Sequence, residues 1–144
     1  MNLAKNGQTG SFVQIVDASV IAHALATEEE LGIQSRRVID RPTQLIIPEC
    51  AYVEVLASLR KMWLRKDISL EVFRQALDDL VILDVHVVDT VELLGRAYEL
   101  RHNVGAYDAM YVALAEVLQC PLITTDVRLS NAAGVRCEIE LLAA

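Results

Sequence analysis

The sequence predicts an α/β fold: a three-layer α/β/α sandwich around a mostly parallel sheet of about five strands. Three observations lead to this prediction. Near-continuous apolar runs of strand length, such as residues 12–16 and 122–125, are typical of parallel strands covered on both faces. These runs alternate along the chain with longer segments of helical spacing. Both runs stop at an acid, Asp17 and Asp126, at the edge where open parallel sheets place their chemistry.

Length and composition bound the organisation of the chain. With 144 residues, of which 53% are hydrophobic, we expect a single domain over 12–144, preceded by a flexible N-terminal tail over 1–11. No apolar stretch reaches the roughly 20 residues of a membrane span, so we expect no membrane association. The three cysteines are far apart and odd in number, which favours free thiols in a reducing cytoplasm.

The first half of the chain is predicted to hold two strands and three helices. Ser19 follows the first strand closely and opens an apolar helix. Pro42 ends the second, more exposed helix, and Pro48 begins the long third helix, since proline is tolerated in a first turn. The predicted elements are strands over 12–16 and 45–47 and helices over 20–25, 28–39 and 49–66.

The second half continues the alternation of helices and strands. Ser69 is a good N-cap for the next helix, and Asp89 or Thr90 caps the one after it. The segment 106–118 is apolar nearly all round, so we expect a buried helix there. The predicted elements are helices over 70–80, 90–101 and 106–118, strands over 81–88, 122–125 and 135–139, and a helical turn over 130–133.

Four acids stand in apolar or small-residue surroundings. Asp17 and Asp126 end apolar strands. Glu54 lies in the long third helix, and its neighbours three and four residues away are all small, which leaves room for a ligand to approach it. Asp108 stands in the first turn of the apolar helix, where an acid gains from the helix dipole.

These acids are predicted to converge on one cation site. If the first and fourth strands are neighbours at a topological switch point, Asp17 and Asp126 lie side by side, and the adjoining helices bring in Glu54 and Asp108. Carboxylates packed together repel unless a cation joins them, and oxygen-rich sites suit Mg²⁺ or Mn²⁺. The alternative is that each acid merely caps a helix or ends a strand. We favour the shared site because all four acids have the same apolar setting.

The net charge of −7 bears on the partners of the protein. An acidic surface argues against broad, non-specific nucleic-acid binding, which requires basic residues. It does not exclude a nuclease, because cations held among the acids reverse the local field. A partner that bears positive charge also fits.

Three segments resemble a known family when taken in order. IVDASVI (15–21), PECAYVEVLASLRK (48–61) and AYDAMYVALAEVLQCPLITTD (106–126) are similar to the PIN domain, and most of all to the small single-domain VapC-type toxins of bacterial and archaeal toxin–antitoxin systems. The resemblance covers residues 12 to about 139. Its third block, a YDA-type helix followed by a short strand ending in T-x-D, is the most specific.

The resemblance implies an Mg²⁺- or Mn²⁺-dependent endoribonuclease that hydrolyses RNA to leave a 5′-phosphate and a 3′-hydroxyl. It also implies a homodimer that pairs with a small VapB-type antitoxin. Some family members carry a further acid just after the Asp126 position, where this chain has Val127 and Arg128, so we expect one firmly bound ion. The family's acidic cluster and its supporting hydroxyls fall on Asp17, Glu54, Asp108, Asp126, Ser19 and Thr124.

Two other classes of function remain open at this stage. One is a catalytically silent PIN-fold binding module. The other is a phosphatase with Asp17 as nucleophile, but such enzymes need a second Asp two residues on, where this chain has Ser19. Arg128 fits either a phosphate contact or an ordinary surface charge.

Overall fold

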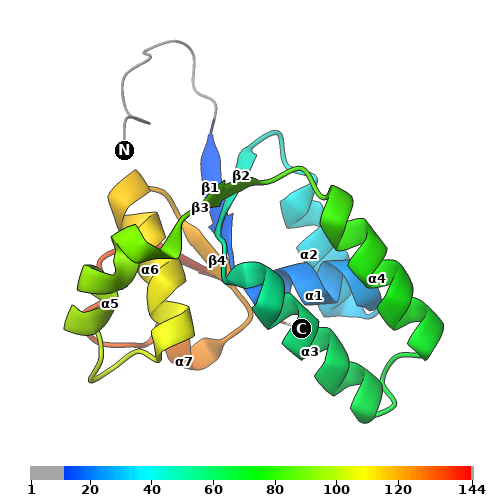
Figure 1. The fold of residues 1–144 in the computed structure, drawn as a ribbon. Coiled ribbons are helices and arrows are strands. Elements are labelled where there is room, and N and C mark those ends of the chain that lie inside the picture. The colour runs from blue at the N-terminus through cyan, green and yellow to red at the C-terminus, as the bar shows by residue number, and fades with distance from the viewer. Residues whose placement is uncertain (1–11, 144) are drawn as a thin grey trace.

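The computed structural model of the protein describes residues 12–143, and its fold is the predicted α/β/α sandwich (Figure 1). The sheet has five strands, all parallel, in the order β3-β2-β1-β4-β5. The predicted tail over 1–11 lies outside the described residues. The strands are β1 (Val13–Val16), β2 (Gln44–Pro48), β3 (His86–Val88), β4 (Leu122–Thr124) and β5 (Ile139–Leu141).

Helices cover the two faces of this sheet. Figure 1 shows α1 to α4 on one side of the sheet and α5 to α7 on the other. Within residues 12–143, every helix falls short of the length and apolar character that a bilayer crossing needs. The helices are α1 (Ala18–Ala26), α2 (Glu30–Ile39), α3 (Ala51–Leu64), α4 (Leu70–Ile82), the 3₁₀ helix η1 (Thr90–Leu93), α5 (Leu94–Glu99), α6 (Ala106–Leu118) and α7 (Val127–Ser130).

The sheet topology places the ends of β1 and β4 side by side. Val16 pairs with Ile123, and the backbone N–H of Asp17 donates to the carbonyl of Ile123 at 3.1 Å. The chain runs from β1 to β2 on one side, and β4 joins β1 on the other, so β1 is a topological switch point. The prediction that the first and fourth strands are neighbours is confirmed.

The core lies where β1, β4 and α6 meet. The side chains of Ile15, Val16, Leu122 and Ile123 are fully buried, and α6 is buried continuously over residues 109–115. The prediction of a buried helix over 106–118 is therefore confirmed, with the same bounds. Because α6 is enclosed, its polar side chains are held in fixed positions relative to the edge of the sheet.

The predicted strand over 81–88 is wrong in its first half. Val81 and Ile82 continue α4 and are each 80% exposed, and only His86–Val88 forms a strand. The two residues have a β-branched, apolar sequence, but α4 packs through Ala76 and Leu80, which are one helical turn apart. Phe12, predicted to begin the buried first strand, is 73% exposed and precedes β1.

The predictions for the last elements are also displaced. The helical turn predicted over 130–133 is α7 at Val127–Ser130, because the Asp126 carboxylate accepts from the backbone N–H of Arg128 and starts the helix earlier. The strand predicted over 135–139 is β5 at Ile139–Leu141. The helix predicted over 90–101 is divided into η1 and α5.

Candidate functional site

Asp17 is the most enclosed of the four acids. It is the N-cap of α1, and its Oδ1 accepts from the Val20 backbone N–H at 3.2 Å and from Ser19 Oγ at 2.5 Å. Its Oδ2 accepts from Thr124 Oγ1, at the end of β4. Burial raises the pKa of Asp17, although these hydrogen bonds act in the opposite direction. Both carboxylate oxygens are therefore fixed at the switch point of the sheet.

The hydroxyl groups around Asp17 form a connected network. Thr124 Oγ1 also accepts from the backbone N–H of Asp126 at 3.0 Å, and Thr125 Oγ1 donates to Ser19 Oγ at 2.8 Å. The structure thus brings both predicted hydroxyl residues, Ser19 and Thr124, to Asp17. Sequence analysis did not single out Thr125, although two consecutive threonines before Asp126 were a visible signal.

Glu54 brings a carboxylate from α3 to the same region. Its Oε1 atom is buried and has no hydrogen-bond partner among residues 12–143. Burial raises the pKa of Glu54 to about 7, and the negative charges of Asp108 and Asp17 contribute to the shift. A buried carboxylate oxygen without a donor costs free energy, and a cation at this position would satisfy it.

Tyr111 of α6 lies against Glu54. It is fully buried, and within the described part of the chain its Oη also lacks a hydrogen-bond partner. Burial raises the pKa of Tyr111, and the nearby Glu54 carboxylate raises it further. Sequence analysis missed this residue, although a tyrosine three positions after Asp108 in an otherwise aliphatic buried helix was a signal for it.

A hollow of about 330 Å³ opens beside Glu54. Ala57 and Ser58, two of the four small neighbours of Glu54, line it. Lys61 and Tyr107 complete its walls. A cationic side chain therefore stands at one end of the site.

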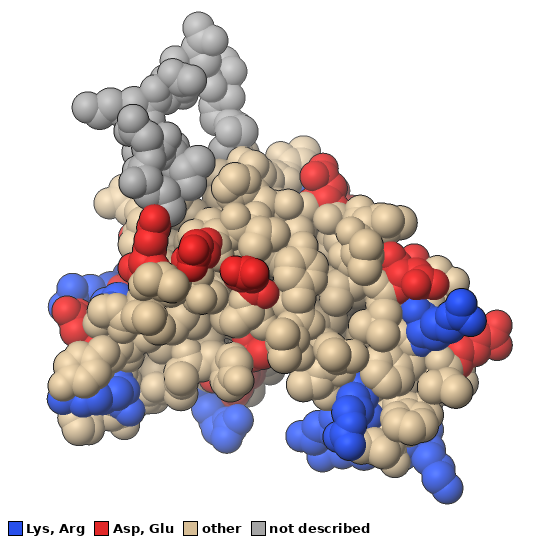
Figure 2. Space-filling view, viewed as in Figure 1, with Lys and Arg blue, Asp and Glu red and all other residues tan. Residues whose placement is uncertain are grey.

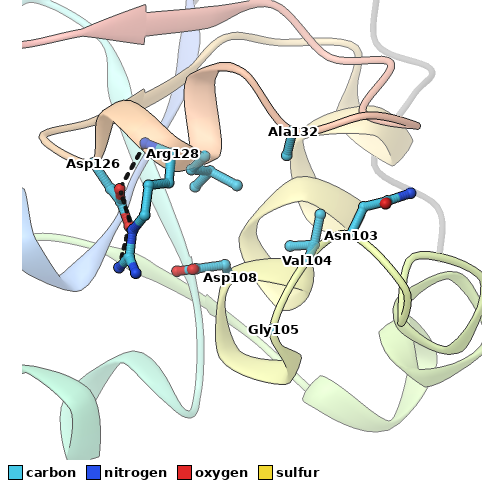
Figure 3. Close-up of a pocket in the computed structure, with 8 residues that line it drawn as sticks. Asn103, Val104, Gly105, Asp108, Asp126, Arg128 and Ala132 are labelled. Atoms are coloured by element: carbon cyan, nitrogen blue, oxygen red, sulfur yellow. Dashed lines mark hydrogen bonds and ion pairs between the residues drawn. The ribbon is translucent and has the colours of Figure 1, made fainter.

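Asp108 and Asp126 line a second hollow, the acid pocket, of about 350 Å³ (Figure 3). Burial and the charges of Asp17 and Asp126 raise the pKa of Asp108. Burial also acts to raise the pKa of Asp126, but the hydrogen bonds and the charge of Arg128 outweigh it, so this pKa is lowered. The acid pocket is lined by Asn103, Val104, Gly105, Asp108, Asp126, Arg128, Leu129 and Ala132.

The four acids therefore fall into two groups. Asp17, Glu54 and Asp108 have raised pKa values, and none of them is ion-paired with a Lys or Arg within residues 12–143. Asp126 has its own cation in Arg128. Figure 2 shows acidic atoms at the floor of a recess, between the surface formed by α3 and that formed by α5 to α7, with basic side chains on both sides.

The donor set has the chemistry of a divalent cation site. Carboxylate and hydroxyl oxygens are the ligands that Mg²⁺ and Mn²⁺ prefer, and the partnerless oxygen of Glu54 is a free donor atom. As the side chains stand, however, no three His, Cys, Asp or Glu residues between 12 and 143 are grouped closely enough to hold an ion.

Fold and site together define a parallel α/β protein with a carboxylate cluster at the carboxyl edge of its sheet. The family model of the PIN domain matches residues 15–135. The protein named Ribonuclease VapC1 of Mycobacterium tuberculosis is 39% identical over 129 residues, which covers 89% of this chain and 96% of that protein. The chain therefore belongs to the PIN-domain family, and within it to the VapC group, as its sequence motifs predicted.

Solved structures agree on the fold. The crystal structure of Mycobacterium tuberculosis VapC20, described as a Sarcin-Ricin loop cleaving toxin, is similar with a TM-score of 0.64 and 18% identity, covering 85% of this chain and 96% of that one. DNA-bound VapBC from Salmonella typhimurium is similar with a TM-score of 0.63 and 18% identity, covering 90% of this chain and 97% of that one. At these identities the likeness supports the fold alone.

Proposed function

We propose that this chain is a metal-dependent endoribonuclease, the toxin of a VapBC-type toxin–antitoxin pair. The observation that carries the proposal is the cluster of Asp17, Glu54 and Asp108, which lies at the switch point of the sheet without an ion-paired Lys or Arg in the described chain. The printed names of the relatives support RNA as the substrate: VapC1 is called a ribonuclease, and VapC20 is described as cleaving the Sarcin-Ricin loop.

The proposed roles follow from the positions of the acids. Asp17, Glu54 and Asp108 would hold one Mg²⁺ or Mn²⁺ ion, and Asp126 would act through water. Such an ion, when bound, neutralises charge on the phosphate and lowers the pKa of water. Because Val127 and Arg128 follow Asp126 where a second ion would need a further acid, we propose a single firmly bound ion.

The residues around the cluster have supporting roles in this proposal. Ser19 and Thr124 donate to opposite oxygens of Asp17 and hold that carboxylate in one orientation, which avoids reorganisation when substrate binds. The hollow beside Glu54 and the acid pocket leave room for the RNA backbone on both sides of the cluster. Lys61 and Arg128, which line these hollows, give each side a cation for a phosphate.

The proposed partners are a second copy of the chain and a VapB-type antitoxin. VapBC from Salmonella typhimurium is named as such a complex. In this chain, large apolar side chains are exposed on α3 and α4, which suits protein contacts, and the net charge of −7 suits a basic antitoxin segment over the acids. These side chains are Val53, Leu56, Trp63, Leu64, Val81 and Ile82. The three free thiols suit a cytoplasmic location.

Cleavage of RNA with defined metal and defined variants tests the function. Wild-type protein is incubated with an RNA pool in Mg²⁺, in Mn²⁺ and in EDTA, alongside Asp17→Asn and Asp108→Asn. Asp78→Asn is the matched control, because Asp78 is exposed on α4 and remote from the site. We expect cleavage by wild type and Asp78→Asn with either metal, and none in EDTA.

Three outcomes would contradict this proposal in different ways. If Asp17→Asn and Asp108→Asn cleave as well as wild type, the acid cluster is not the active site. If wild type cleaves no RNA while a divalent ion still binds to the acids, measured by calorimetry, the chain is a binding module. Cleavage that persists in EDTA would exclude the metal requirement alone.

A further inference from the structure

A second groove adjoins the acid pocket and has no role in holding the carboxylates. It lies between α5 and α6 and has a volume of about 400 Å³. We call it the α5–α6 groove. Its walls are mostly apolar, with one aromatic ring and one cation. The lining residues that matter here are Leu94, Ala97, Tyr98, Arg101, Ala106 and Met110.

The groove and the acid pocket are adjacent. Val104 and Gly105 line both of them, and Asp108 of the acid pocket stands three residues after Gly105. Apart from its two chain neighbours, no heavy atom lies within 4 Å of the position that a Cβ would occupy on Gly105, so the space beside this residue is open. A chain-like ligand with one part at Asp108 can therefore reach into the α5–α6 groove.

One wall of the groove carries a cation–π pair. The guanidinium of Arg101 lies 4.2 Å from the centre of the Tyr98 ring, and Tyr98 is 66% exposed. Arg101 donates to the Tyr98 carbonyl at 3.0 Å, and no ion pair with an acid is found for it between residues 12 and 143. Its charge is thus available to a ligand.

Arg96, which lies on α5 five residues before Arg101, differs from it in its contacts. It forms an ion pair with Glu116 at 2.6 Å and another with Glu99 at 3.0 Å, and it also donates to the Gly134 carbonyl. Its charge is neutralised within the fold, and its role is to join α5 to α6. Of the two arginines, only Arg101 combines a free charge with an exposed aromatic neighbour.

From this geometry we propose that the α5–α6 groove binds one unpaired nucleobase of the RNA substrate, next to the phosphate that is cleaved. The proposal rests on the proposed function. Unpaired bases stack on tyrosine rings and on arginine guanidinium planes, which is the surface that Tyr98 and Arg101 present. A duplex cannot insert a base in this way, so the substrate class is single-stranded or loop RNA.

Removal of a single base from the RNA tests whether the groove binds a base. End mapping locates the cut in one cleaved RNA, and synthetic copies then lack the base on one or the other side of that phosphate. For wild type we expect KM to rise about 5- to 100-fold for one of the two copies, with kcat little changed, as the loss of one stacked base predicts.

The variants then assign that effect to Tyr98. Tyr98→Ala should raise KM for the intact RNA by a similar factor, and the abasic copy should show no further rise with this variant, because the same contact is already lost. Tyr98→Phe keeps the ring and should retain the wild-type KM. Folding is not at risk, since the Tyr98 side chain is largely exposed.

A pair of glycine substitutions tests the passage. Gly105→Gln places a side chain between the acid pocket and the groove, and it should raise KM. Gly95→Gln is the matched control, because Gly95 lies on α5, does not line the groove and also has open space at its Cβ position. Gly95→Gln should leave KM unchanged.

The outcomes separate this proposal from the proposed function. If wild type cleaves RNA and Tyr98→Ala has the wild-type KM, the groove proposal is wrong and the nuclease stands. If Tyr98→Ala instead leaves KM unchanged and alters only the oligomeric state of the protein in solution, the groove is a protein–protein contact and the proposal is also wrong. If wild type cleaves nothing, fluorescence anisotropy with labelled single-stranded RNA decides: binding that depends on Tyr98 supports the groove, and its absence overturns it.

Discussion

Asp17 and Asp126 come from the same arrangement in the sequence, yet their surroundings differ. Each follows a short buried strand and N-caps the next helix. Asp17 is 4% exposed and is surrounded by hydroxyl groups, and its pKa is raised. The Asp126 side chain is 28% exposed and paired with Arg128, and its pKa is lowered. The end of a strand places an acid at the edge of the sheet. The side chains around that acid then determine whether its negative charge is paired within the fold or is available to a ligand.

The largest difference is expected in catalysis. Asp17→Asn should lower kcat/KM for RNA by about 100- to 1000-fold, the range for loss of one preorganised electrostatic group at a reacting centre. Asp126→Asn should lower it about tenfold, since this carboxylate is partly exposed, is paired with Arg128 and would act through water. Single-turnover cleavage measured for both variants under the same metal concentration gives the ratio. Equal losses would mean that the two acids have equivalent roles.

Thr124 joins the two acids and provides the next test. Its hydroxyl donates to Asp17 and accepts from the backbone N–H of Asp126. Thr124→Val keeps the shape of this fully buried side chain but leaves both groups without a partner, so the free energy of unfolding should fall by about 1–3 kcal/mol. Urea denaturation of wild type and variant measures this change in the free energy of unfolding.

Ser130→Ala is the control for Thr124→Val. Ser130 Oγ donates to the Val127 carbonyl on an exposed turn, and its loss should cost less than about 0.5 kcal/mol. If Thr124→Val is as stable as wild type, the hydroxyl does not connect the two acids.

The dependence of stability on pH should separate the two groups of acids. The pKa of folded Glu54 is about 7, above its ordinary value of 4.5, so in this range the folded protein binds more protons than the unfolded chain. Its contribution to stability is present below about pH 4.5 and is lost as the pH rises through about 7. Since Glu54 is only partly buried, we expect a loss of about 1–2 kcal/mol.

For Asp126 the sign is reversed. Its pKa is lowered in the folded protein, so its contribution is present above its ordinary value of 3.8 and is lost as the pH falls below it. Urea denaturation in EDTA between pH 2 and pH 8 measures both slopes. Glu54→Gln should flatten the decline between pH 4.5 and 7, and a decline unchanged in this variant would assign it to another group.

Sequence reasoning predicted the fold correctly and singled out the four acids because the signals are local. The apolar runs before Asp17 and Asp126 and the enclosed helix over 106–118 are visible without tertiary information. The prediction failed at Val81 and Ile82, since exposure depends on which face of α4 packs against the rest of the chain, and β-branched residues favour a strand by themselves.

The details of the site depend on packing that no spacing encodes. Tyr111 faces Glu54 only because α3 and α6 approach each other at the edge of the sheet. The charge state of Asp126 depends on Arg128, which sequence analysis interpreted as a phosphate ligand or a surface charge. Arg128 is only two residues from Asp126, so the position at which α7 begins decides the environment of this acid. The sequence placed this helical turn three residues too late.

The smallest expected effect is that of Arg128 itself. Its side chain is 93% exposed, and its Nη2 lies 3.4 Å from Asp126 Oδ2, so the ion pair is weak. Arg128→Gln should lower the free energy of unfolding by about 0.2–1 kcal/mol, the range for exposed pairs. Arg74→Gln is the control, because Arg74 is exposed on α4 and forms no ion pair between residues 12 and 143.

The more informative measurement on Arg128→Gln is the titration of Asp126. Carboxyl-carbon NMR should show the pKa of Asp126 rising, because the charge that holds it down is removed. Asp126 would then resemble Asp17 and Asp108, the acids with raised pKa values, and its affinity for a divalent ion should increase. If the pKa of Asp126 stays low without Arg128, the backbone N–H groups at the start of α7 hold it down instead, and the contrast with Asp17 comes from the helix end rather than from a cation.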